Sequence, residues 1–273
     1  MQSRPPFALN RIISPGLSLS AFIRFAAECS AAHVEIRNDL SDPSLLGGED
    51  AASIKSICTD NGIDILTVNA LQRFNDLQLF GVKKQELTDL METAASVGCR
   101  KIVLCPVNDA GDQRTASQQH DDLVAALIGY APLFEQYNMT GLVEPLGFSI
   151  CSIRYKRQAA EAIDDSRYSH LYQIVHDTFH HYLSGETELF PEQTGLIHAS
   201  GVHRGKDLAD ITDDDRLLVD EQDIMDNKGQ IAELYERGFT GDLSFEPFSP
   251  EVQNLPTQEL QLRIAGSMAF LFG

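Results

Sequence analysis

Two hydrophobic periods alternate along the chain. Short apolar segments rich in β-branched residues are typical of buried strands, and between them lie longer segments with helical spacing. The helical segment after the third strand candidate places its apolar residues on one face: Leu87, Leu90, Met91 and Ala94. Gly98 follows, where a helix C-cap glycine is expected. The eight strand candidates are residues 7–12, 33–37, 64–70, 101–107, 140–146, 172–178, 195–201 and 241–248.

Eight strands, each followed by a helical segment or helical loop, are the count for a closed parallel barrel, the α/β (β/α)8 or TIM barrel of about 250 residues. The chain has 273 residues and no linker-like composition shift, so we expect a single domain over residues 1–273. An open doubly wound sheet stays an alternative, because periodicity does not report closure. No glycine-rich phosphate loop follows the first strand, which disfavours the dinucleotide-binding form of that sheet.

The carboxyl ends of the last strands carry the candidate chemistry, since active sites of this fold lie there. The fifth and eighth strand candidates both end in Glu-Pro, at Glu144 and Glu246. Proline cannot donate a ladder hydrogen bond and keeps the preceding residue extended, so each glutamate should be the last ordered residue of its strand. One such glutamate is usually only solvated, but two of them with Asp and His on the strands between are harder to dismiss.

The sixth and seventh strands bring Asp177 and His198 to the same rim. Four potential ligands therefore come from four adjacent strands. Three carboxylates and one imidazole suit a single divalent ion, Mn²⁺, Mg²⁺, Co²⁺ or Zn²⁺, without choosing among them. We predict a metal site formed by Glu144, Asp177, His198 and Glu246.

The other histidines have simpler interpretations. One member of the pair His180 and His181, just after the sixth strand, could cap the following helix. His176 points away from Asp177 in a strand and should pack against a helix. The remaining four are expected at the surface: His33, His120, His170 and His203.

Composition narrows the partners. The chain carries 21 basic and 40 acidic residues, a net charge of −19, which repels nucleic acids and anionic membranes. Five scattered cysteines without a CxxC pair favour free thiols in a reducing cytoplasm. No apolar run approaches the ~18 residues of a membrane span, and the N-terminal segment lacks a signal core. We therefore expect a cytoplasmic protein; homo-oligomerisation is left open.

The order Glu, Asp-x-x-His, His, Glu on strands five to eight resembles that of the xylose isomerase-like TIM barrels. These include sugar isomerases and epimerases, a dehydratase and nucleases of the endonuclease IV type. Within this superfamily, blocks along nearly the whole chain are similar to those of inosose (2-keto-myo-inositol) isomerases. The blocks are HVEIR at 33–37, VNALQRFN at 68–75, VEPLGF at 143–148, VHDTFHH at 175–181, DDDR at 213–216 and LSFEPFSPE at 243–251.

The resemblance implies roles for individual residues. It makes the four predicted ligands a metal site, with Glu144 and Glu246 as the acid/base pair. It makes His180, rather than His181, a group that polarises a substrate oxygen, and Arg216 a group that binds one. On its own, Arg216 would be interpreted as a surface counter-ion to its neighbouring aspartates. Three strand-end residues would line the pocket for a polyol: Asn10, Glu35 and Asn69.

Two segments depart from the family pattern. After His198 the family usually has an acidic residue, whereas this chain has HASG with Ser200 and Gly201. After DDDR the family usually has Gly-x-Gly, whereas this chain has VDEQDIMDN. Both departures fall near the expected substrate and bear on its identity more than on the metal.

The implied activity is metal-dependent isomerisation or epimerisation of a sugar or polyol ketone through an enediolate, with inosose as the first candidate and inositol catabolism as the context. One alternative is a lyase that removes water from a cyclic polyol through the same enediolate. Another is a non-catalytic sugar-binding barrel. The presence of all four ligand types disfavours it, while the altered segment after His198 and the missing glycines keep it open. A nuclease would need more His and Asp ligands and a basic face, and the net charge disfavours it.

Overall fold

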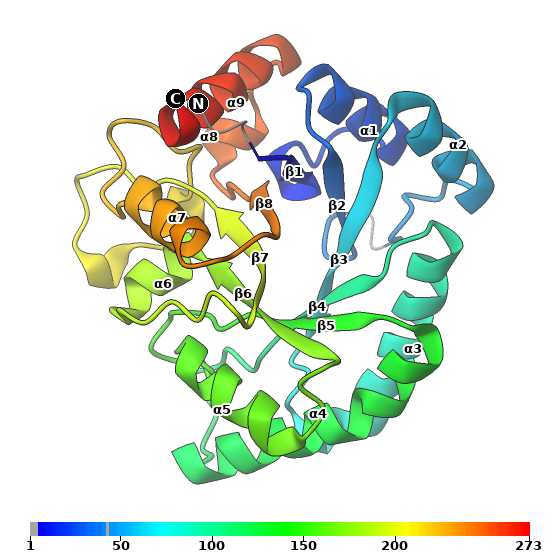
Figure 1. Ribbon diagram of the computed structural model, residues 1–273, viewed down its shortest axis with the longest axis vertical. Helices are drawn as coiled ribbons and strands as arrows, with labels where there is room; N and C mark the ends of the chain where they lie inside the picture. The colour runs from blue at the N-terminus through cyan, green and yellow to red at the C-terminus, as the bar shows by residue number, and fades with distance from the viewer. Residues whose placement is uncertain (1–4, 42–43) are drawn as a thin grey trace.

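The computed structural model describes residues 5–41 and 44–273 as an eight-stranded parallel barrel surrounded by helices (Figure 1). Strand order follows the sequence, and β1 pairs with β8 through Phe7 beside Leu243, which closes the barrel and excludes an open sheet. All eight strand candidates are confirmed. Their bounds are β1 (Phe7–Asn10), β2 (His33–Arg37), β3 (Asp64–Gln72), β4 (Lys101–Cys105), β5 (Thr140–Val143), β6 (Tyr172–Asp177), β7 (Thr194–Ala199) and β8 (Asp242–Phe245).

Helices connect each strand to the next around the outside of the barrel (Figure 1). They are α1 (Leu19–Glu28), α2 (Ala51–Asn61), α3 (Phe80–Ser96), α4 (Ala116–Tyr137), α5 (Lys156–Ser166), α6 (Thr178–Ser184), α7 (Asn227–Glu236), α8 (Pro250–Gln253) and α9 (Thr257–Phe272). Short 3-10 helices are η1 (Arg11–Ile13), η2 (Leu77–Leu79), η3 (Leu208–Asp210) and η4 (Asp213–Asp215). Helix ends follow local chemistry: the Thr115 hydroxyl accepts the backbone N–H of Gln118 at the start of α4, and Asn138 ends it in the left-handed conformation.

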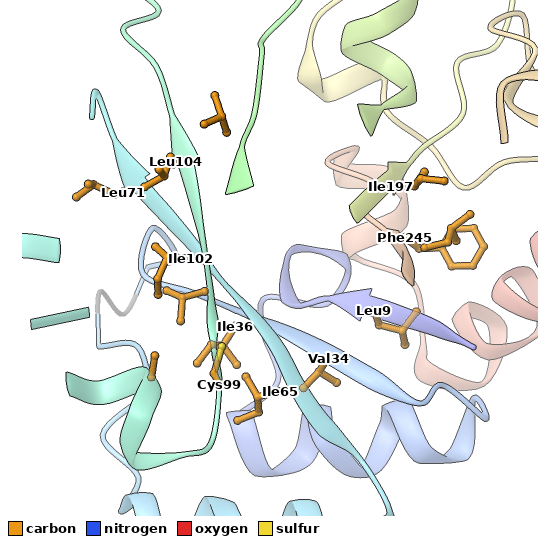
Figure 2. Packing of buried hydrophobic residues seen from close by; sticks show 14 of the residues in the cluster. Leu9, Val34, Ile36, Ile65, Leu71, Cys99, Ile102, Leu104, Ile197 and Phe245 are labelled. Carbon is orange, nitrogen blue, oxygen red and sulfur yellow. The ribbon is translucent and has the colours of Figure 1, made fainter. Parts of the chain in front are cut away.

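The strands separate two apolar layers, because successive side chains point to opposite faces. Outward residues pack against the helices; Ile102 and Leu104 of β4 are examples (Figure 2). Full burial of such a side chain stabilises the fold by roughly 1.5–3 kcal/mol. Inward residues fill the barrel in a second cluster: Ala70, Val103, Cys105, Leu142, Val175 and Leu196. The inward positions that follow this plug along each strand are the ones that reach the carboxyl-end rim.

The five cysteines are free thiols, as expected. Across residues 5–41 and 44–273, no helix combines the length and apolar character needed to cross a membrane.

Candidate metal centre

The four predicted ligands reach the interior of the barrel because of where they lie relative to its apolar plug. Leu142, Val175 and Leu196 belong to the inner cluster. Two residues further along the same strands come Glu144, Asp177 and His198, and two residues after Ser244 comes Glu246. A strand repeats its facing direction every two residues, so all four side chains share the inward direction at the same rim.

Their ligand atoms converge within 4.8 Å of one another, and all four residues are buried. His198 Nδ1 lies 2.7 Å from Glu144 Oε1, 3.2 Å from Glu246 Oε2 and 4.0 Å from Asp177 Oδ2. Among the described residues, this is therefore a group of oxygen and nitrogen donors that could hold a metal ion, as the sequence predicted.

Two buried arginines surround the centre. Arg216 is only 1% exposed, which corrects its interpretation as a surface counter-ion. Its Nη2 donates to Asp177 Oδ2 at 2.6 Å and to Glu246 Oε2 at 2.9 Å. The guanidinium carbon lies 4.8 Å from the ring centre of Phe179 and 4.7 Å from that of Phe248. Delocalised guanidinium groups stack well on aromatic faces, so the rings fix its plane.

Arg37 is the residue that sequence reasoning missed. Its Nη1 donates to Glu246 Oε1 at 2.8 Å, and its Nη2 donates to Asp39 Oδ2 at 2.7 Å. The signal was present in HVEIR, since Arg37 follows Glu35 by two residues and so shares its inward direction. Glu246 is consequently held between two guanidiniums, one on each oxygen.

The net charge of the site favours a divalent cation. Four buried carboxylates (Glu35, Glu144, Asp177 and Glu246) surround two buried guanidiniums (Arg37 and Arg216), an excess of two negative charges. Burial lowers the pKa of His198, but Glu246, Glu35 and Glu144 more than offset this and hold it well above the ordinary value. Burial raises the pKa of Glu246, yet His198 and then Arg216 hold it well below its usual range. A divalent ion beside a neutral His198 would balance the excess charge.

A cavity of about 160 Å³ opens onto this centre. Its wall includes two ligands, Glu144 and Glu246, with both arginines and the rings of Phe148 and Phe248. Asn69 and His180 also line it, where the sequence predicted contacts with a substrate. The Nδ1 atom of His180 is buried and has no hydrogen-bond partner within the described residues.

Glu35 and Asn10 require a correction, because neither lines this cavity. Both are fully buried, and the amide of Asn10 donates to Glu35 Oε1 at 3.2 Å and to Glu246 Oε1 at 3.0 Å. Their inward direction was predicted correctly, but they lie behind the ligands instead of on the surface of the pocket.

The departure after His198 is accommodated by the loop that carries Arg216. Ser200 Oγ accepts a hydrogen bond from Arg216 Nε at 3.0 Å, so a neutral group stands where the family usually has an acid. Gly201 exchanges backbone hydrogen bonds of 2.7 Å with Leu217, and a Cβ at Gly201 would lie 2.9 Å from the carbonyl oxygen of Leu218. The segment 207–226 contains only short 3-10 helices, and its Arg216 is buried at the site.

Most of the remaining histidines lie away from the centre. His176 is buried outside the barrel, where Nε2 lies 3.0 Å from Gln230 Oε1 of α7, as its strand position predicted. His33, His120 and His203 pair with Asp242, Asp165 and Asp220, respectively, and none of them is buried.

Comparison with known proteins places this geometry in a family. A family model described as a xylose isomerase-like TIM barrel matches residues 23–270. The chain belongs to the xylose isomerase-like TIM barrel family. It is 26% identical over 235 residues to the inosose isomerase of Halalkalibacterium halodurans, covering 83% of this chain and 82% of that protein.

Solved structures show the same fold. A xylose isomerase domain-containing protein from Salmonella typhimurium is 31% identical, with a TM-score of 0.91 over 99% of this chain and 98% of that one. The IOLI protein, solved with a zinc atom, is 20% identical, with a TM-score of 0.88 over 97% of each chain. A D-psicose 3-epimerase shares the fold at 13% identity and a TM-score of 0.70, over 98% of this chain and all of that one.

Proposed function

We propose that the protein is a divalent-metal-dependent isomerase or epimerase of a keto-polyol, with inosose as the leading substrate. The observation that carries the proposal is the convergence of Glu144, Asp177, His198 and Glu246. Two of them, Glu144 and Glu246, line a cavity. We propose inosose as the substrate because relatives named inosose isomerase align with this chain over most of their length. The zinc atom of the IOLI structure supports a metal in a barrel of this shape.

The proposed ligands are Glu144, Asp177, His198 and Glu246. When bound, a divalent ion supplies Lewis-acid polarisation of two vicinal substrate oxygens, which acidifies the neighbouring C–H group. His198 would bind through Nδ1, because that nitrogen faces the three carboxylates.

Proton transfer is assigned to the two glutamates, since both line the cavity. One carboxylate removes the proton from the carbon that bears a hydroxyl next to the carbonyl. The C–H electron pair forms the double bond of an enediolate, and the former carbonyl oxygen takes the negative charge. The other glutamate returns a proton. For isomerisation this proton goes to the former carbonyl carbon, while the hydroxyl proton of the neighbouring oxygen moves to the former carbonyl oxygen, so that the neighbouring carbon becomes the new carbonyl. For epimerisation the proton goes to the opposite face of the carbon that lost it, and the original carbonyl forms again.

His180, Arg216 and Asn69 are assigned to the substrate's oxygens. His180 and Asn69 both line the cavity, and His180 has a buried ring nitrogen without a hydrogen-bond partner among the described residues. Phe148 and Phe248 offer apolar surface to the C–H groups of a ring. These contacts would hold the reacting carbons in place while the cavity walls exclude water.

The substrate is proposed to be uncharged and compact. Both arginines of the wall are already paired with carboxylates, and four acidic residues border the cavity: Asp39, Glu144, Asp213 and Glu246. A phosphate group would meet repulsion without a free cation to bind it. This favours a free polyol ketone over a sugar phosphate.

The test is incubation of the protein, loaded separately with Mn²⁺, Zn²⁺, Mg²⁺ and Co²⁺, with inosose in D₂O, followed by NMR. The expected result is a second keto-polyol with deuterium at the carbon next to the carbonyl. Glu144→Gln should abolish the exchange, while the exposed control Glu161→Gln should not change it. No turnover of inosose or any ketose would overturn the proposal, and an enone absorbance would identify the lyase instead. Unchanged sugar affinity in Glu144→Gln without turnover by the wild type would identify a binding protein.

A further inference from the structure

His198 is held from both sides of its ring. Nδ1 faces the cluster of carboxylates, 2.7 Å from Glu144 Oε1. Nε2, on the opposite edge, lies 3.1 Å from Glu35 Oε2. In a neutral imidazole one nitrogen carries the proton and the other is free to bind a metal, and the partner of the protonated nitrogen decides which is which.

Glu35 is itself fixed by a dedicated set of donors. Its Oε2 accepts the Thr67 hydroxyl and the Asn69 amide, the latter at 2.9 Å, and its Oε1 accepts the Asn10 amide at 3.2 Å. The side chain is fully buried and does not line the cavity. An ionised carboxylate can only accept hydrogen bonds, so Glu35 is matched to these donors and to an N–H at Nε2 of His198.

Two other roles for Glu35 do not fit this placement. It cannot serve as a fifth ligand of the same centre, because the ring of His198 lies between its carboxylate and the ligand cluster. It is also badly placed to bind substrate, since donors already occupy both oxygens and no part of the side chain reaches the cavity.

We infer that Glu35 is a positioning residue: it accepts the Nε2 proton of His198 and thereby selects Nδ1 as the metal-binding nitrogen, with Thr67 as its chief support. The inference rests on the metal centre of the proposed function. It extends the site to the first three strands, which contribute no ligand of their own.

The chain offers a graded set of variants. Glu35→Gln keeps the size of the side chain but removes its charge, and its amide would face the Asn69 donor. Thr67→Val removes one donor and leaves the carboxylate. Thr194→Val is the matched control, because Thr194 is another buried barrel threonine whose hydroxyl donates only to Phe190, at 2.8 Å.

The first readout is the dissociation constant of Zn²⁺, measured by competition with a chelator on the whole protein. We expect Glu35→Gln to weaken binding by roughly 10- to 100-fold, as loss of an outer hydrogen-bond partner does in other metal sites. Thr67→Val should weaken it less, and Thr194→Val should stay within about twofold of the wild type because it is outside the network.

The second readout is nitrogen NMR of Zn²⁺-loaded protein with ¹⁵N-labelled histidine. The wild type should show His198 in one form, protonated at Nε2 and bound to the metal through Nδ1. In Glu35→Gln, His198 should no longer be found only in this form. A purely structural role would leave this signature unchanged. If Glu35→Gln does not fold, the same signature and affinity in Thr67→Val decide the question.

The outcomes separate the two proposals. Wild-type protein that binds no metal overturns both of them. Wild-type protein that binds metal through Nε2, or a folded Glu35→Gln variant with unchanged affinity and proton position, overturns only the role of Glu35. For a Glu35→Gln variant that does not fold, unchanged affinity in Thr67→Val has the same consequence.

Discussion

The inward-pointing side chains at the barrel rim form two groups that differ in their contacts. The half from β5 to β8 presents Glu144, Asp177, His198 and Glu246 to one another. The half from β1 to β3 presents Asn10, Glu35, Arg37, Thr67 and Asn69, which hydrogen-bond to one another and to the ligands of the first half. An inward polar residue at a strand end is therefore a candidate ligand or a candidate supporting residue, and only its neighbours across the barrel show which of the two it is.

The largest effect should come from breaking the ligand half. Glu246→Gln removes a ligand and half of the proposed acid/base pair. We expect turnover to fall by about 10²–10⁴-fold, the range for loss of a positioned acid or base, with metal affinity falling as well. Steady-state kinetics and metal analysis of the dialysed variant provide the measurement; retention of wild-type turnover would contradict the assignment.

Breaking the support half should act first on the fold. Arg37→Gln leaves Glu246 and Asp39 without their shared cation, and removing one partner of a buried pair typically costs about 3–5 kcal/mol. Urea unfolding of the metal-free protein measures this loss. A loss of less than about 1 kcal/mol, as for an exposed pair, would show that the support half is not needed for the fold.

A backbone contact within the half from β5 to β8 gives an intermediate effect. A Cβ at Gly147 would lie 2.1 Å from the carbonyl oxygen of His180, so Gly147→Ala must displace the start of α6. We expect a loss of about 1–3 kcal/mol in stability and a higher KM for the substrate. Gly266→Ala, where a Cβ meets nothing within 4 Å, is the control.

The pH dependence of stability and of metal binding should report the coupling of the two halves through His198. Because its folded pKa is well above the ordinary value, its contribution to metal-free stability is complete below about pH 6.5 and lost as pH rises through the folded pKa. Glu35 acts in the opposite window: its contribution is present above its unfolded pKa and lost as pH falls toward about 2. Binding of a metal requires neutral His198, so it should release about one proton near pH 7.

Calorimetry of metal binding in buffers of different ionisation enthalpy measures this proton. Binding without proton release would place His198 outside the ligand set or show it to be neutral beforehand. The first result would remove the link between the two halves.

The smallest effect serves as a baseline for the others. Arg263 pairs with Glu259 one turn away on the surface of α9, at 2.9 Å, with both side chains well exposed. Arg263→Ala should cost no more than about 0.5 kcal/mol by urea unfolding and leave turnover unchanged. A larger loss would mean that surface pairs and buried pairs are not distinguished as proposed.

The sequence predicts the half from β5 to β8 well, because the evidence for that half is local. Strand ends, the two Glu-Pro pairs and the two-residue repeat place Glu144, Asp177, His198 and Glu246 without any knowledge of the packing. The eight strands followed from the same kind of local pattern. Their number favoured a closed barrel, but closure itself is shown only by the pairing of β1 with β8.

The support half depends on contacts that no local pattern contains. Glu35 and His198 are 163 residues apart in sequence, and Arg37 and Glu246 are 209 apart. Whether Glu35 contacts a substrate or a metal ligand is decided only when the fold places β2 across the barrel from β7. The prediction for Arg216 was wrong for the same reason. Three adjacent aspartates in the sequence favour an exposed position, whereas in the fold Arg216 is buried and donates to Asp177 and Glu246.

Metal stoichiometry after exhaustive dialysis tests the central claim most directly. Wild-type protein equilibrated with a divalent ion and then analysed by mass spectrometry should retain one ion per chain, as should the exposed control Glu161→Gln. The double variant Asp177→Asn, Glu246→Gln should retain none while remaining folded by circular dichroism. An ion-free wild type, or a folded double variant that binds as the wild type does, would contradict the metal centre.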